Sequence, residues 1–114
     1  MKASNILRSV ALTASATGAT TVVAAIAEME IRVLGLSFQF NAGVNVKFQS
    51  GSDDITGLWY GGANTVVTLP IVPDEEKQFW FKTGKGAALN INLSGNIAVG
   101  GVIIYKIVPA TDRR

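Results

Sequence analysis

The strictest pattern in this sequence is an alternation of apolar and polar residues in "ALNINL" at 88–93. Leucine and isoleucine alternate there with Asn90 and Asn92. Successive side chains of a β-strand point to opposite faces, so this period of two predicts a strand with one buried and one wet face. The segment "VNVKFQ" at 44–49 repeats the pattern. Strands of this kind are typical of an antiparallel sheet that is packed on one side. We therefore expect Asn90 and Asn92 to point outward and not to form a binding site.

The rest of the chain reads as short apolar segments separated by Gly, Asn, Asp, Ser and Pro, which favour turns. Val, Ile and Thr supply 31 of 114 residues and Gly another 12, a composition that favours strands over helices. The predicted strands are Ile6–Ala14, Thr20–Ala27, Glu30–Phe40, Val44–Gln49, Thr56–Tyr60, Thr65–Leu69, Ala88–Leu93 and Ile97–Val108. This pattern predicts an all-β fold, a single antiparallel β-sandwich that is jelly-roll-like and has about eight strands.

Two of these strands, Glu30–Phe40 and Ile97–Val108, carry apolar residues on both parities. A strand with one wet face does not need this, so we expect each to be covered on both sides. The opposite sheet would cover one side, and a neighbouring chain or a loop the other. This feature predicts a homo-oligomer. In "LSGNIAV" at 93–99, Gly95 and Asn96 tolerate positive φ and predict a tight hairpin.

The length suits one domain. We expect an N-terminal arm at 1–9, the sandwich at 10–109 and a C-terminal tail at 110–114. The first 27 residues imitate a signal peptide, with Lys2 and Arg8 followed by small residues before Glu28. Threonines and serines interrupt the apolar region at strand spacing, which favours strands that stay on the mature chain. A cleaved signal remains the alternative.

The residue types that are missing exclude much chemistry. The sequence has no Cys and no His, which removes disulfides, the usual zinc sites and Ser-His-Asp or Cys-His catalysis. We expect no enzymatic activity and no cofactor. The net charge of +2 comes from scattered basic residues and does not indicate nucleic-acid binding. No apolar run reaches the roughly 18 residues that span a bilayer, so no membrane partner is expected.

Two acidic clusters could supply oxygen ligands to calcium. They are Asp53 with Asp54, and the run Asp74 to Glu76. Neither follows the spacing of a dedicated calcium loop, so solvated turns are the better interpretation and no metal site is predicted.

The aromatic residues beside loops are the best candidates for an interface. Trp59, Tyr60, Phe79 and Trp80 lie next to turn residues. Alternation along 79–81 must place at least one large ring on the outer side if that segment is a strand. Exposed rings mark protein interfaces or carbohydrate stacking, whereas core packing is the alternative for any one of them.

The arm supplies three further candidates, Ile6, Leu7 and Arg8. Two apolar side chains and a cation at the start of the chain suit docking onto a larger surface. A frayed terminus with no role is the alternative.

Several segments together resemble small structural proteins of tailed bacteriophages. These segments are "TTVVAA" at 20–25, "IRVLG" at 31–35, "FQSGSDDITG" at 48–57, "WFKTGKGAALNINLSG" at 80–95 and "VGGVIIY" at 99–105. Each is made of strand and turn residues, and their order carries the resemblance, which spans roughly residues 10–105. The segment "PIVPDEEKQ" at 70–78 is more charged than the resemblance leads one to expect.

The resemblance implies a non-enzymatic virion protein on the capsid surface. Such modules form symmetric oligomers, often trimers, that decorate or cement the head by binding the major capsid protein. The alternative is a carbohydrate-binding or adhesion module of a phage fibre or tail appendage, with Trp59, Tyr60 and Trp80 as stacking platforms. A third possibility, a secreted accessory domain of an enzyme, would require the signal peptide.

Overall fold

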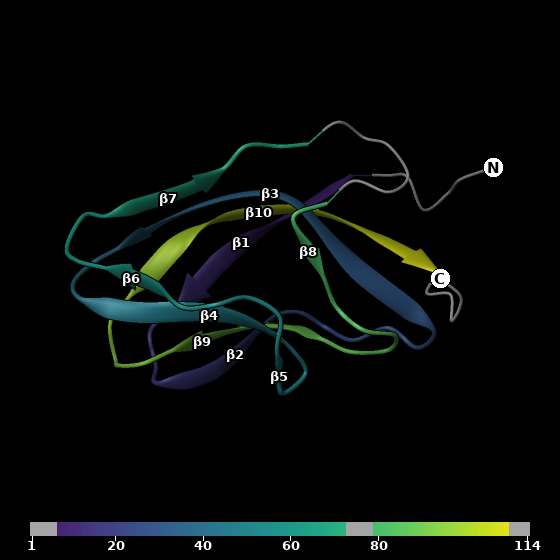
Figure 1. Ribbon diagram of the computed structural model, residues 1–114, viewed down its shortest axis with the longest axis horizontal. Helices are drawn as coiled ribbons and strands as arrows, with labels where there is room; N and C mark the ends of the chain where they lie inside the picture. The colour runs from purple at the N-terminus through teal and green to yellow at the C-terminus, as the bar shows by residue number, and fades with distance from the viewer. Residues whose placement is uncertain (1–6, 73–78, 110–114) are drawn as a thin grey trace.

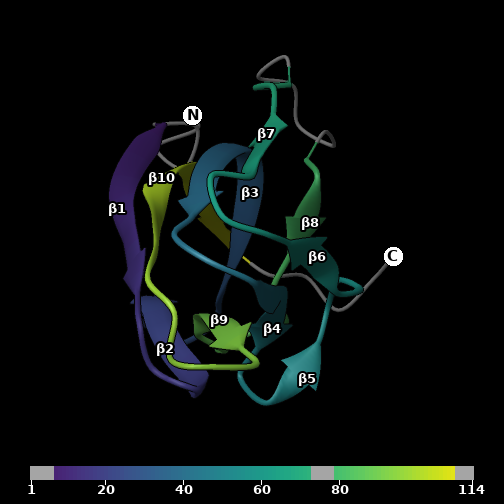
Figure 2. The ribbon, with the colours of Figure 1, turned by 90° about the vertical axis from the view of Figure 1, so that its left-hand side faces the viewer.

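The computed structural model describes residues 7–72 and 79–109. These residues form two antiparallel sheets packed face to face (Figures 1 and 2). The first sheet contains β1 (Arg8–Ala14), β10 (Val99–Pro109), β3 (Met29–Phe40), β7 (Val66–Leu69) and β8 (Phe81–Lys82). The second contains β2 (Gly18–Val23), β9 (Leu89–Leu93), β4 (Val44–Ser50), β5 (Asp53–Asp54) and β6 (Trp59–Gly61). The predicted all-β antiparallel sandwich is confirmed.

The connections between the strands give the sandwich its jelly-roll character. The chain changes sheet between β1 and β2, β2 and β3, β3 and β4, and again before β7, β9 and β10. Sequential neighbours therefore face each other across the core more often than they pair. The described strands number ten because two-residue β5 and β8 join the eight expected from the sequence. The described residues contain no helix that is long and apolar enough to cross a membrane.

The core lies between the sheets and follows the predicted alternation. The apolar residues of β9 are at most 1% exposed, and its asparagines point to the outer side. Aromatic rings fill the centre of the core. The ring of Phe48 lies 6.0 Å from that of Phe38 and 5.2 Å from that of Phe81, measured between centroids. Tilted and edge-on pairs at these distances add to the free energy gained by burial.

A tight hairpin joins β4 to β5. β4 and β5 pair through Ser50 and Asp53, and Gly51 between them has φ +60°, which a residue with a side chain rarely adopts. The predicted hairpin at Gly95 and Asn96 is wrong. β9 belongs to the second sheet and β10 to the first, so this loop crosses between the sheets. Both strands point apolar residues into the same core. A loop that crosses between the sheets buries these residues as well as a hairpin would.

The segment that imitates a signal peptide forms two strands of the sandwich. β1 pairs with β10 along seven consecutive residues, and Leu12 is fully buried. β2 ends at Val23, four residues before the predicted end, and it starts at Gly18 (φ +97°), where the chain turns out of the first sheet. Likewise, the predicted strand Thr56–Tyr60 starts only at Trp59.

The apolar residues on both sides of β3 are covered within the chain. Leu34 is the extra residue of a bulge, since Gly35 pairs with Ile104 and Val33 with Tyr105. The Leu34 carbonyl accepts a hydrogen bond from the Val72 amide, 3.0 Å away, and Leu34 is fully buried. A Cβ on Gly35 would come within 3.0 Å of the Ile71 backbone, so only glycine lets this segment lie against the strand. The sequence predicts that a neighbouring chain or a loop covers the outer side of β3. At this part of β3 the cover is a loop.

Candidate interaction surfaces

The predicted arm residues lie at the start of the described chain. Leu7 precedes β1 and is 42% exposed, and Arg8 is the first residue of that strand, opposite Tyr105 of β10. Ile6 lies outside the described residues. The exposed leucine and arginine are thus at the end of an edge strand.

The rings of Trp59 and Tyr60 point to opposite sides of the second sheet. Trp59 is partly buried and packs edge-on against Phe48, with ring centroids 5.6 Å apart. Tyr60 is 75% exposed on the outer side. The backbone alternation of β6 separates the two rings, so this pair offers one exposed aromatic side chain.

Phe79 and Trp80 lie just before β8, which pairs with the first sheet. The guanidinium of Arg32 lies 5.3 Å from the centre of the Phe79 ring. Trp80 is 43% exposed, and its indole Nε1 donates a hydrogen bond to the carbonyl of Pro70, 2.8 Å away. The exposed ring of Tyr60 thus lies on β6 of the second sheet, and that of Trp80 lies in the loop just before β8 of the first sheet.

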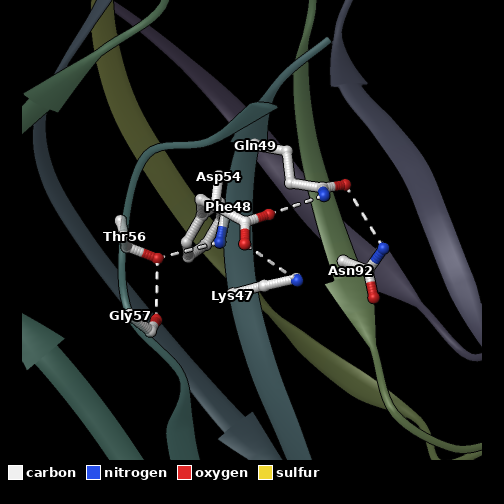
Figure 3. A network of polar contacts seen from close by, with 7 residues as sticks. All are labelled: Lys47, Phe48, Gln49, Asp54, Thr56, Gly57 and Asn92. Carbon is white, nitrogen blue, oxygen red and sulfur yellow. Dashed lines mark hydrogen bonds and ion pairs between the residues drawn. The ribbon is translucent and has the colours of Figure 1, made fainter. Parts of the chain in front are cut away.

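The outer side of the second sheet carries a network of polar side chains (Figure 3). We call the following residues the polar face: Lys47, Gln49, Asp54, Asn90 and Asn92. The Asp54 carboxylate accepts hydrogen bonds from Gln49 Nε2 at 2.9 Å and Lys47 Nζ at 3.1 Å. Asn92 donates to the Gln49 side chain at 3.2 Å, and Asn90 donates to the Gly51 carbonyl at 2.8 Å.

The electrostatics of the polar face follow from these contacts. Hydrogen bonds from Gln49 and Lys47, together with the charge of Lys47, lower the pKa of Asp54 below its ordinary value. Asp53 and Asp54, the described acidic cluster, thus lie in a hairpin where Asp54 is bonded to neighbouring side chains. Within 7–72 and 79–109, no group of three or more acidic residues is placed to hold a metal ion. The second acidic cluster, 74–76, is outside those ranges.

Part of the outer side of the first sheet has no charged side chains, unlike the polar face of the second sheet. This part is formed by β1, the start of β10, the end of β3 and β7. Its side chains form two rows that cross all four strands in register. The first row is Thr13, Gly100, Gln39 and Val66. The second row, two residues along each strand, is Ala11, Val102, Ser37 and Thr68. We call these eight residues the uncharged face. None of them carries a charge.

The uncharged face has protruding side chains and borders a hollow at one end. The hollow has a volume of about 500 Å³, and its lining joins Thr13, Gln39 and Gly100 of the first row to residues beyond the face such as Asn41 and Asn64. Val66 and Val102 protrude and are 57% and 40% exposed. This relief could not be predicted from the sequence, because the rows join residues up to 91 positions apart in the chain, Ala11 and Val102.

The other half of the same side carries a buried ionic cluster. The Glu30 carboxylate accepts hydrogen bonds from Arg32 Nε at 2.6 Å and Lys82 Nζ at 3.4 Å, and its side chain is 5% exposed. Lys106, opposite Arg32 in the register, is also buried. Sequence analysis missed this cluster. Its one signal was charged residues within otherwise apolar strands.

One side of the sandwich has two open strand edges. β1 ends one sheet and β2 ends the other, and Figure 2 shows both along the same side. In the described part of the chain, each has a partner strand on one side only. Natural proteins protect such edges with charges, prolines or bulges. β2 has a bulge before Val23, but β1 has no bulge or proline, and its one charge is Arg8 at the end.

Comparison with known proteins supports the fold. No family model matches the chain, and no curated protein matches it. One similar solved structure comes from work entitled "Bacillus endospore appendages form a novel family of disulfide-linked pili". The match has a TM-score of 0.51 and 9% sequence identity and covers 93% of this chain and 88% of the other. At this identity the likeness shows a shared fold. The present sequence has no Cys for a disulfide link.

Proposed function

We propose that this chain is a structural subunit that works by binding other proteins in a repeating particle. In the form that the sequence resemblance favours, the particle is the virion of a tailed bacteriophage, and the chain decorates or cements the capsid by contact with the major capsid protein. The role is non-enzymatic. The observation that carries the proposal is the outer edge of β1, which pairs with no strand of residues 7–72 and 79–109 and lacks the protection usual for a soluble monomer.

An open edge is a binding site for another strand. Along β1, every second backbone N–H and C=O points away from β10, because a strand uses alternate groups on its two sides. A partner strand that pairs with these groups adds main-chain hydrogen bonds without needing a shaped pocket. Leu7 and Arg8 lie at one end of this edge, where an apolar contact and a cation extend it onto a larger surface.

Purified virions test the biological setting. If the chain decorates the head, quantitative mass spectrometry of purified particles finds many copies per virion, and a cryo-electron-microscopy reconstruction places them over capsomer junctions in a symmetric oligomer, a trimer by the resemblance. Absence of the chain from washed particles contradicts the capsid role.

Hydrogen exchange tests the edge itself. In the isolated chain, alternate amides of β1 that point away from β10 exchange quickly, and on the particle they become protected. Amides of β9, which has a strand on each side, serve as the internal control and stay protected in both states. If β1 exchanges equally fast in both states, strand addition at this edge is wrong.

A fibre subunit is the second candidate, and the similarity to a solved pilus protein favours it. This corresponds to the adhesion module of a fibre or appendage among the alternatives above. The two candidates differ in what the purified chain does alone. A fibre subunit forms filaments visible by negative stain at high concentration, whereas a capsid protein stays a small oligomer until particles are added.

A further inference from the structure

We propose that the uncharged face is a second interface, on which two copies of this chain pack face to face about a two-fold axis. This interface is independent of the β1 edge, because it uses side chains of the sheet surface and not the backbone of an edge strand. The occupant is a second copy of the same chain.

Charge is the first argument for a second copy. None of the eight residues in the two rows is ionisable, whereas the polar face on the opposite side joins Lys47 and Asp54 in one network. Burying a charge without a partner is costly. The surface of a partner that contacts the uncharged face therefore has to be uncharged itself. The same face on a second copy meets this requirement.

The second argument is the relief of the face. Consider a two-fold axis that lies in the interface plane, crosses the strands and passes β10 at residue 101. It places the first row of one copy over the second row of the other, reciprocally. In three of the four pairs a larger residue then meets a smaller one, and in the fourth two β-branched residues of similar size meet. The four facing pairs are Gly100 with Val102, Ala11 with Thr13, Ser37 with Gln39, and Thr68 with Val66.

The central pair shows most clearly how this fits. Val102 is 40% exposed and protrudes, and the hollow that Gly100 helps to line accepts the corresponding valine of the second copy. Two antiparallel β10 strands cross at this point with their sheets about 10 Å apart, as in aligned sheet packing. Large residues over small ones are what close packing requires.

The area of the face sets the expected strength. Four strands about 4.8 Å apart, three contributing about six residues and β7 four, at about 3.3 Å per residue, give a footprint of roughly 350 Å² per copy. Protruding side chains enlarge this, so two copies bury about 1,000 Å² in total, near the lower limit for a specific interface. We therefore expect a micromolar dimer in the isolated chain, which a repeating particle strengthens by holding many copies together.

The first experiment is sedimentation velocity of the full chain at about 1 and 100 µM, which bracket a micromolar dissociation constant. We expect a dimer of the 12.0 kDa chain at the higher concentration. Gly100→Arg fits the fold, because a Cβ there meets only the Leu12 carbonyl oxygen at 3.8 Å. It should leave a folded monomer. Gly57→Arg adds the same side chain in open space in the loop before β6 and should dimerise like wild type.

The second experiment tests the two-fold register by exchanging large and small residues. Gly100→Val opposes two valines and should raise the dimer dissociation constant at least about tenfold. Adding Val102→Ala restores one large and one small residue and should recover affinity to within about threefold of wild type. Circular dichroism checks that each variant is folded.

Three results overturn the proposal: a wild-type chain that stays monomeric at the higher concentration, a Gly100→Arg variant that dimerises like wild type, or a double variant no tighter than Gly100→Val. None of them bears on the β1 edge, which is tested on particles by hydrogen exchange.

Discussion

The polar face and the uncharged face lie on opposite sides of one sandwich, and both follow the same alternation along their strands. On the polar face, Asp54, Gln49 and Asn92 bond to one another, and the network carries its own donors and acceptors. On the uncharged face, Ser37 and Thr68 share a hydrogen bond of 3.4 Å, and glycine, alanine and valine occupy much of the rest.

The alternation of apolar and polar residues along a strand predicts burial on the inner side and says little about the outer side. Both outer faces satisfy the requirement that strands place apolar groups inward. What distinguishes them is how their side chains combine across neighbouring strands, and that depends on the register of segments far apart in the chain. We infer that the uncharged face is an interface, whereas the polar face forms most of its hydrogen bonds within the chain and, among its described side chains, leaves the buried Asn90 Oδ1 without one.

The largest expected loss of stability comes from a charge placed in the core, on the inner side of the sheets. Ile91→Asp buries an unpaired charge in a position that is fully enclosed, and we expect a loss of more than about 4 kcal/mol in the free energy of unfolding, enough to unfold the domain. Thr21→Asp, on the outer side of β2 and beside Asn90, is the control and should change stability by about 1 kcal/mol or less. Urea denaturation measures both. A soluble, cooperatively folding Ile91→Asp chain contradicts the inner assignment of this residue.

A smaller loss of stability is expected at one of two adjacent glycines of β10 and not at the other. A Cβ on Gly101 would overlap the carbonyl oxygen of Ser37 and lie 2.6 Å from the Phe38 Cα, whereas Gly100 has room. We expect Gly101→Ala to cost about 2–4 kcal/mol, because the strand must move away from β3. Gly100→Ala should be neutral or stabilising by about 0.5 kcal/mol. Thermal unfolding compares them, and equal melting temperatures would show that β10 does not approach β3 this closely.

A still smaller loss of stability is expected when polar side chains are shortened, and it should differ between the polar and the uncharged face. Replacing Asn90 and Asn92 with Ser removes their hydrogen bonds to Gly51 and Gln49, and the double variant should lose about 1 kcal/mol. Gln39→Ser on the uncharged face removes an exposed amide and should change the free energy of unfolding by less than about 0.5 kcal/mol. The measurement is chemical denaturation at a concentration where the chain is monomeric. A larger loss from Gln39→Ser would reverse the contrast between the faces.

The smallest effect is a pH dependence from Asp54. Its pKa is lowered in the folded state, so the folded chain binds fewer protons there than the unfolded chain does near pH 4. The contribution of Asp54 to stability is therefore present above the unfolded pKa of about 3.9 and is lost as the pH falls through the folded value. We expect the stability difference between wild type and Asp54→Asn to shrink as the pH falls below about 4. A difference that is constant with pH contradicts the network around this carboxylate.

Among the predicted interface residues, the sequence located the exposed ones only in part. Trp80 is exposed, but it lies in the loop before β8, so strand alternation along 79–81 does not set its direction. Tyr60 is exposed as well. Trp59, its neighbour in the chain, packs against Phe38 and Phe48. A position beside a loop does not fix the direction of a ring, because that direction depends on where the short β6 pairs with β4. The bacteriophage role stays a prediction.

The sequence by itself determined the fold class, the antiparallel sheets and the parity of residues such as Ile91 and Asn92. These follow from a period of two and from turn residues, which are local properties of the chain. Only the tertiary structure decided that the loop at Gly95 crosses between sheets, that β1 and β2 each pair on one side only within the described residues, and that Gly100 faces outward beside Val102. Each of these depends on pairing between distant segments, and burial of the same apolar residues is compatible with more than one such pairing.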